Sequence, residues 1–241
     1  MNVKIKELAK MIGHSILHPT MTDEILIREC EVAKRFDVAS VCVKPYAVEK
    51  AKSILKGTDV AVGCVIGFPH GNSTVRTKIF ETEMACKDGA VEIDMVVNIG
   101  KVLSGDWGYI EQEIKAVTDV CHQYNAIVKV IFETDFITGT EDKIKLCEIC
   151  TNVGADFVKT STGYGFVKQT DGSYNYTGAT ISDLLLMRKH SGPNVQVKAA
   201  GGVRTLDELL KVKETGTARV GATATIAILE DANRRFADQD N

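Results

Sequence analysis

Apolar, β-branched runs alternate with amphipathic stretches along the whole 241-residue chain, and this alternation limits the possible folds most strongly. Strands that are separated by helices imply parallel βαβ units. Eight such units in a chain of this length predict a (β/α)₈ barrel, with a doubly wound open sheet as the alternative. The runs with the composition of strands are His14–Leu17, Val38–Val43, Val60–Ile66, Val91–Val97, Ile127–Glu133, Asp156–Thr160, Val195–Ala199 and Ala218–Gly221.

Helix start signals stand between these runs. Thr22 and Asp106 precede amphipathic stretches, and Thr205-Leu-Asp-Glu208 has the pattern of a capping box. We interpret Asn72 as the N-cap of a further helix. Because no linker, repeat or low-complexity segment divides the chain, residues 1–241 are expected to form one catalytic barrel domain.

Composition limits the partners of the chain. Its 29 basic and 32 acidic residues give a net charge of −3, which argues against nucleic acid or an anionic membrane as partner. No apolar run has transmembrane length and the N-terminus lacks an apolar signal core, so a cytoplasmic location is expected. The seven cysteines are scattered, and no second pair accompanies Cys147-Glu-Ile-Cys150 to complete a zinc site. We therefore expect neither a metal nor another cofactor.

The predicted strands carry charged side chains on one face only. A strand that helices cover on both faces of a sheet should be apolar on both. Here one face is apolar, and the other collects Asp94, Lys129, Glu133, Lys159 and Lys198. The pattern predicts a polar barrel interior near the C-terminal mouth, where barrel active sites form.

Lys159 and Lys198 lie in the middle of apolar strands, where an ammonium group is costly unless it finds water or a partner. A lysine beside a second cation loses proton affinity, and its neutral amine can attack an aldehyde to form an imine. Asp94 would hold the second lysine and transfer protons. The alternative is a buried ion network with a purely structural role, and spacing alone does not separate the two.

Glycine-rich segments follow the last three predicted strands. They are Thr160–Gly163 after Lys159, Gly201-Gly-Val-Arg204 after Lys198, and Val220–Ala224 after the final strand. Glycines let backbone N–H groups approach an anion, and helix N-termini favour negative charge. Because the loops after the seventh and eighth strands usually hold phosphate in barrels, the pattern indicates a phosphorylated substrate.

Several of these segments resemble, in order, the class I deoxyribose-phosphate aldolases, from about Ile12 to Leu229. The matching segments are Gly67-Phe-Pro-His-Gly71, Glu92–Asn98, Val128–Thr134, Gly154–Gly163 and Val197–Arg204. The resemblance implies a (β/α)₈ barrel that needs no metal. It also implies reversible cleavage of 2-deoxy-D-ribose 5-phosphate to acetaldehyde and D-glyceraldehyde 3-phosphate, a step in deoxyribonucleotide catabolism.

The resemblance also implies roles for individual residues. Lys159 would form the imine with the C1 aldehyde, while Asp94 and Lys198 would transfer protons through a water. A homo-oligomer, preferably a dimer, is expected, with a small-molecule sugar phosphate as ligand. The substrate and its phosphate would contact Gly163, Gly201, Gly202, Arg204 (mainly through its backbone), Gly221 and Cys42.

The chain departs from the family pattern at several positions. Gly13 stands where aspartate is usual, and Thr223-Ala224 replaces paired serines. The segment 164–176, with a turn expected at Asp171-Gly172, is longer than usual. This insertion is either a lid over the phosphate side or, as the preferred interpretation, a surface hairpin without a role.

Other functions remain open at this point. One alternative is a Schiff-base aldolase with a different aldehyde specificity. Another is a non-catalytic barrel that binds sugar phosphates, although such a protein would not need to retain Lys159, Asp94 and Lys198. A metal-dependent aldolase is disfavoured because no ligand cluster is evident at the strand ends.

Overall fold

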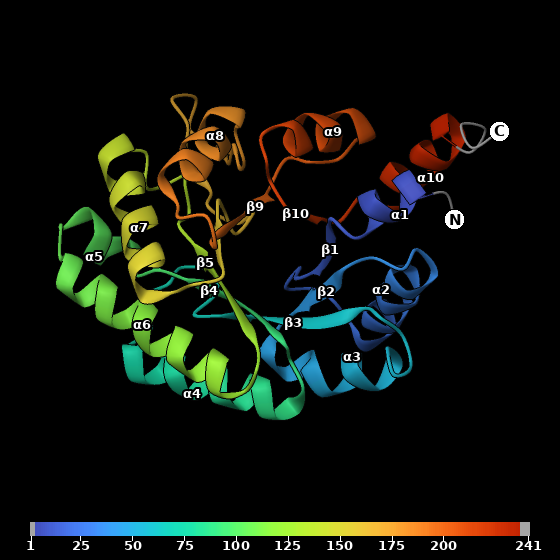
Figure 1. Cartoon of the computed structure of the whole chain (residues 1–241), viewed down its shortest axis with the longest axis horizontal. Helices are drawn as coiled ribbons and strands as arrows, with labels where there is room; N and C mark the ends of the chain where they lie inside the picture. The colour runs from blue at the N-terminus through green and yellow to red at the C-terminus, as the bar shows by residue number, and fades with distance from the viewer. Residues whose placement is uncertain (1–2, 237–241) are drawn as a thin grey trace.

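The computed structural model describes residues 3–236 and shows a closed barrel of parallel strands inside a ring of helices (Figure 1). Each strand pairs with its neighbours around the barrel, and β10 returns to pair with β1. This closure confirms the predicted (β/α)₈ barrel and rules out the open sheet. In order around the barrel, the strands are β1 (Ile12–Ile16), β2 (Ser40–Val43), β3 (Ala61–Ile66), β4 (Glu92–Val96), β5 (Ile127–Ile131), β6 (Phe157–Lys159), β9 (Gln196–Ala200) and β10 (Arg219–Ala222).

Helices follow the strands and cover the outside of the barrel. Figure 1 shows the first and last helices lying side by side where the described chain begins and ends. The helices are α1 (Val3–Ala9), α2 (Asp23–Arg35), α3 (Val48–Ile54), α4 (Val75–Asp88), α5 (Ile99–Leu103), α6 (Trp107–Gln123), α7 (Thr140–Val153), α8 (Ile181–His190), α9 (Leu206–Glu214) and α10 (Thr225–Phe236), with a short 3₁₀ helix at Pro45–Ala47. No helix among residues 3–236 combines the length and apolarity that crossing a membrane requires.

Most of the predicted helix caps are confirmed. Thr22 accepts a hydrogen bond from Ile25 N, and the capping box of α9 forms between Thr205 and Glu208. The prediction that Asn72 is a helix N-cap is wrong, because the N-cap of α4 lies two residues further along the chain. Thr74 Oγ1 accepts from Thr77 N at 3.2 Å and is the true N-cap.

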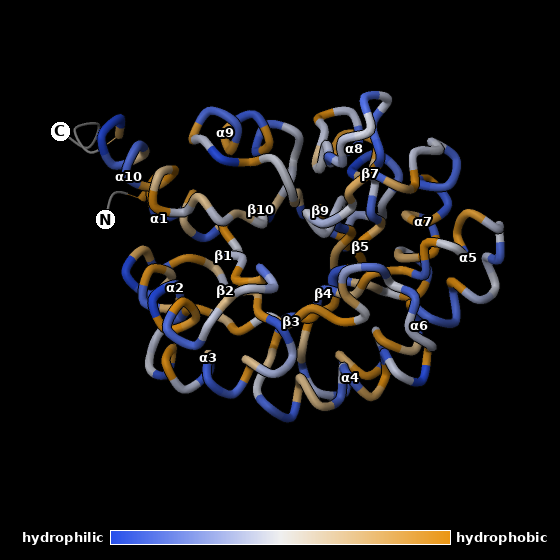
Figure 2. The backbone as a smooth tube through the Cα atoms, turned by 180° about the vertical axis from the view of Figure 1, so that it is seen from behind, coloured by the Kyte–Doolittle hydropathy of each residue, from blue (hydrophilic) through white to orange (hydrophobic). Residues whose placement is uncertain are grey.

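The main hydrophobic core lies between the barrel and the helices. Figure 2 shows hydrophobic residues along the strands and hydrophilic ones on the outer turns of the helices. On β5 and just after it, Val128, Val130 and Phe132 belong to this core, whereas Lys129 is buried on the opposite face. The predicted division into an apolar outer face and a charged inner face is therefore confirmed here.

The cysteines behave as apolar residues. All seven are free, and Cys147 and Cys150 are buried within α7. Burial raises the pKa of the Cys147 thiol to about 11, so this thiol is protonated at neutral pH. The Cys-x-x-Cys pair therefore packs as part of the apolar face of α7.

A buried ion pair outside the barrel fixes the end of β4. Lys78 Nζ donates to Glu113 Oε1 and to the Val96 carbonyl oxygen, both at 2.7 Å. The other carboxylate oxygen of Glu113 accepts from Asn98 N at 2.8 Å. Because a buried charge is tolerated only when it is paired and hydrogen-bonded, these contacts hold the chain in one position just after β4.

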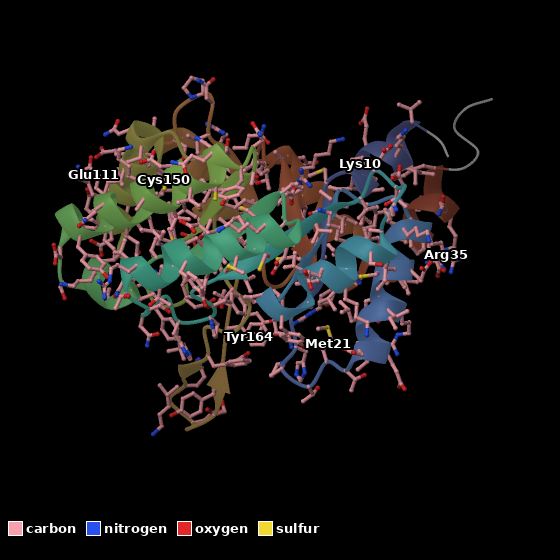
Figure 3. All side chains as sticks on the ribbon, turned by 90° about the horizontal axis from the view of Figure 1, so that it is seen from below. Lys10, Met21, Arg35, Glu111, Cys150 and Tyr164 are labelled. Carbon is pink, nitrogen blue, oxygen red and sulfur yellow. The ribbon has the colours of Figure 1, made fainter. Side chains whose placement is uncertain are left out.

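A two-stranded hairpin rises from the barrel after β6. It consists of β7 (Val167–Lys168) and β8 (Tyr174–Asn175), and the predicted turn lies between them, where Gly172 has a φ of 85°. Figure 3 shows the hairpin projecting beyond the barrel on the side of Tyr164 and Met21, with Lys10 at the opposite end. Since Tyr164 follows β6, this side is the C-terminal mouth.

Candidate active site

Three lysines surround one carboxylate inside the barrel. Asp94 Oδ2 accepts from Lys159 Nζ and from Lys198 Nζ, each at 2.7 Å, and Asp94 Oδ1 accepts from Lys129 Nζ at 2.9 Å. The strand register brings them together, because Asp94 pairs with Lys129 across β4 and β5 and Lys159 pairs with Lys198 across β6 and β9. The three predicted catalytic residues therefore lie in direct contact.

Lys129 and Glu92 extend this cluster. Lys129 Nζ also donates to Glu92 Oε2 at 2.9 Å, and Arg219 Nη2 lies 3.3 Å from Glu92 Oε1. Neither Lys129 nor Glu92 is among the catalytic residues expected from the sequence. The signal was present in the sequence, since Lys129 and Glu92 occupy the same alternating face as Asp94.

The cluster contains more positive than negative charge. Four cations share two carboxylates, and this excess favours proton release from one lysine. Burial, together with the ammonium groups of Lys159 and Lys129, lowers the pKa of Lys198 to about 8, although Asp94 opposes this shift. Burial alone would raise the pKa of Asp94, but the three surrounding ammonium groups hold it well below its usual range.

The two lysines on Asp94 Oδ2 differ in their access to the barrel mouth. Lys159 lines a cavity of about 670 Å³ that opens there. Asp94 and Lys198 lie behind this lining, and both are buried. Lys159 is therefore the lysine of this cluster whose amine can reach a molecule in the cavity.

The glycine loops line the same cavity. Its lining includes every glycine predicted to contact phosphate, namely Gly163, Gly201, Gly202 and Gly221. Gly201 and Gly202 have φ values of 81° and 89°, a left-handed conformation that suits glycine. The cavity thus brings the Lys159 amine and a glycine-rich wall together.

Arg204 also lines this cavity, but its backbone is already engaged. Arg204 N and Thr205 N donate to Glu208 Oε2 at 2.7 and 2.9 Å as part of the α9 cap. The guanidinium group, rather than the backbone N–H, therefore remains for an anion at this position.

Glu133 fixes the loop that follows Lys159. Its Oε2 accepts from Thr162 N at 3.1 Å and from Thr162 Oγ1, and its backbone has a φ of 60°. Burial raises the pKa of this carboxyl group. Glu133 lay on the predicted polar face, but its contact with Thr162 depends on a loop conformation that strand periodicity does not encode.

Cys42 and Gly13 lie beside the lysine cluster. Cys42 is buried in an apolar group with Leu17 and Val65, outside the cavity lining. A Cβ built on Gly13 would lie 3.6 Å from Lys198 Nζ. An acidic side chain at position 13 would thus begin next to this lysine, and the native glycine leaves that position without a carboxylate.

The described residues contain no group of three or more His, Cys, Asp and Glu side chains arranged to hold a metal ion. The cavity lining includes His18 and Glu29 as well as several hydroxyls, the Lys159 amine and the Arg204 guanidinium. The amine suits attack on a carbonyl group, and the guanidinium suits binding of an anion.

Comparison with known proteins agrees with this arrangement. The chain is 47% identical over 230 residues to a deoxyribose-phosphate aldolase from Rhodopirellula baltica, covering 95% of this chain and 91% of that protein. It is 45% identical over 228 residues to the corresponding aldolase of Thermococcus gammatolerans, covering 94% of this chain and 96% of the relative.

Solved structures share the fold. The aldolase QR15 is 31% identical, with a TM-score of 0.86, and the match covers 96% of this chain and 98% of QR15. A tetrameric deoxyribose phosphate aldolase from Aeropyrum pernix has a TM-score of 0.84 at 24% identity, and its match covers 95% and 92% of the two chains. The sequence profile of the DeoC/LacD family aldolases matches residues 9–229. The chain therefore belongs to the DeoC/LacD family of aldolases.

Proposed function

We propose that this protein is a deoxyribose-phosphate aldolase that cleaves 2-deoxy-D-ribose 5-phosphate to acetaldehyde and D-glyceraldehyde 3-phosphate through a Schiff base on Lys159. The contact of two buried lysines with one oxygen of Asp94, with only Lys159 lining the cavity, carries this proposal. The curated relatives, which are named deoxyribose-phosphate aldolases, support it.

The reaction begins when the neutral amine of Lys159 attacks the C1 aldehyde of the open-chain sugar and a water molecule leaves. The resulting iminium ion accepts the electron pair of the C2–C3 bond, because its nitrogen is positively charged. As this bond breaks, the C3 hydroxyl loses its proton and D-glyceraldehyde 3-phosphate departs. The remaining enamine takes a proton at C2, and hydrolysis of the imine then releases acetaldehyde and restores the amine.

Asp94 and Lys198 have different roles in moving these protons. The carboxyl pKa of Asp94 is far below neutral, so Asp94 remains ionised and mainly holds the two lysines. The pKa of Lys198, about 8, is close to the working pH, which suits a group that both takes and returns protons. Lys198 would exchange protons with the C3 hydroxyl and the enamine through a water.

The rate of imine formation is expected to rise with pH around an inflection near 8, where the lysine pair releases a proton. In Lys198→Leu, Asp94 Oδ2 would accept a hydrogen bond from one ammonium group, that of Lys159, instead of two. That ammonium would hold its proton more firmly, and the inflection should move to higher pH. Imine formation can be measured against pH with acetaldehyde and borohydride.

The exposed Lys56→Leu variant is the control for this change and should keep the native profile.

The pH dependence of the stability of the native protein gives a second measurement of the Lys198 pKa. Because folding lowers the pKa of Lys198, the native protein should gain stability between pH 8 and the unfolded lysine value of about 10.4. An unchanged inflection in Lys198→Leu would show that the two lysines are not coupled.

A direct assay tests the reaction itself. The protein should release D-glyceraldehyde 3-phosphate from 2-deoxy-D-ribose 5-phosphate, as measured by coupling to a dehydrogenase. Addition of EDTA should leave the rate unchanged, because the protonated imine is the electron sink. Loss of activity with EDTA, reversed by added metal, would contradict the proposed mechanism.

We also propose that the protein is a cytoplasmic homo-oligomer. Six of its seven free cysteines are buried, which suits a reducing compartment. The related Aeropyrum pernix enzyme is tetrameric. Light scattering of the purified protein would distinguish the dimer expected from the sequence from a tetramer or a monomer.

A further inference from the structure

The hairpin after β6 is attached to the glycine loop after β9. Ala179 N donates to the Gly201 carbonyl oxygen at 3.1 Å, and a Cβ built on Gly178 would lie 2.7 Å from the Gly201 carbonyl carbon. On the other side, the carboxylate of Asp135 accepts from Thr177 N at 2.6 Å and from Gly178 N at 3.0 Å. These contacts fix the chain directly after Tyr176, so the hairpin is more than a free surface loop.

Tyr176 is held over the phosphate side of the cavity by both its ring and its hydroxyl. Its ring meets the edge of Phe166 at an interplanar angle of 89° with centroids 5.4 Å apart, and a Cβ on Gly201 would lie 3.4 Å from Tyr176 Cε2. Arg204 Nη2 lies 3.5 Å from Tyr176 Oη, which it faces as donor. Tyr176, Gly201 and Arg204 all line the 670 Å³ cavity.

We propose that the Tyr176 hydroxyl binds the phosphate group of the substrate and that the 164–176 insertion selects phosphorylated substrates. The inference rests on the proposed function and adds Tyr176 to the residues that bind its substrate. Since the Tyr176 oxygen faces an Arg204 donor, and its own proton has no acceptor among residues 3–236, that proton is available to an anion in the cavity. A phosphate oxygen beside the guanidinium would accept it.

The hydroxyl of Thr223 is a second candidate contact for the phosphate. Thr223 lines the same cavity from the loop after β10, whereas the next residue, Ala224, has no hydroxyl. Tyr176 would contact the phosphate from the hairpin side, with the glycine loops between the two hydroxyls. Charge-assisted hydrogen bonds of this kind are stronger than those between neutral groups.

Tyr174 provides a matched control on the same hairpin. Its side chain is 63% exposed and lies outside the cavity lining. Tyr176→Phe and Tyr174→Phe therefore remove the same hydroxyl group from neighbouring positions, and both retain the ring. Only the first change should affect the phosphate.

The test compares 2-deoxy-D-ribose 5-phosphate with unphosphorylated 2-deoxy-D-ribose. In Tyr176→Phe, KM for the phosphorylated sugar should rise about tenfold, the effect of one hydrogen bond to a charged group, while kcat stays near the native value. The kcat/KM for 2-deoxy-D-ribose should change less than about twofold, within the scatter of a neutral substitution. Tyr174→Phe should match the native protein with both sugars.

Calorimetric titration with inorganic phosphate gives a readout that does not need turnover. Tyr176→Phe should bind phosphate about tenfold more weakly than the native protein and Tyr174→Phe. Equal losses with both sugars, or unchanged KM and phosphate affinity, would overturn the role of Tyr176 while leaving the aldolase function intact. If the native protein did not turn over either sugar, the proposed function would fail, and the phosphate titration would still decide the inference.

Discussion

Replacing Lys159 with leucine is expected to lower kcat by a factor of about 10⁴ or more, the scale found when a catalytic nucleophile is removed. Lys159 is the amine that lines the cavity, and its neighbours Lys198 and Lys129 lie behind that lining, so neither can replace it. The fold should be retained, because the substitution removes one cation from a cluster with an excess of positive charge. The coupled aldolase assay and a thermal melt would measure the two effects.

Trapping of the intermediate tests the assignment of the nucleophile directly. With acetaldehyde and borohydride, the imine on Lys159 should be reduced to a stable N-ethyl lysine that peptide mass spectrometry can locate. Lys198→Leu is the matched control, because Lys198 is equally buried and contacts the same oxygen of Asp94. Its adduct should form more slowly but still at Lys159. An adduct on another lysine would contradict the proposed mechanism.

The barrel and its three central residues could be predicted because each depends on a short-range pattern. Strand and helix periodicities set the order of elements, and alternation within the strands placed Asp94, Lys159 and Lys198 on one face. Parallel strands in register then brought side chains of different strands to the same depth in the barrel. No knowledge of loop conformation was needed for these steps.

The parts that could not be predicted depend on contacts between loops. The contact of Tyr176 with Gly201 and Arg204 joins the hairpin after β6 to the loop after β9, and no spacing rule relates these segments. The preferred interpretation of the hairpin as a surface feature therefore missed its position at the cavity. In the same way, Arg204 N donates to Glu208 in the cap of α9, so that the guanidinium group of Arg204 is left for an anion. This contact depends on the local geometry of the helix cap.

The second large effect is expected from Asp94→Asn. Asp94 accepts hydrogen bonds from Lys129, Lys159 and Lys198. Removing its charge would leave Glu92, which contacts Lys129, as the remaining carboxylate that is hydrogen-bonded to this cluster. Breaking a buried ion pair by removing one partner costs about 3–5 kcal/mol, so the free energy of unfolding should fall by about this amount. Urea unfolding at pH 7 would measure the loss, and the aldolase rate should fall with it because Lys159 loses the contact that positions its amine.

The pH dependence of this loss follows from the lowered pKa of Asp94. A carboxyl group with a depressed folded-state pKa contributes its stabilisation above the unfolded pKa of about 3.9 and loses it as the pH falls further. The stability difference between the native protein and Asp94→Asn should therefore be constant from pH 7 to 5 and narrow below about pH 4. Adding Lys198→Met to Asp94→Asn removes one of the uncompensated cations and should restore part of the lost stability. If Asp94→Asn were as stable as the native protein at pH 7, the carboxylate would not be neutralising the lysine cluster.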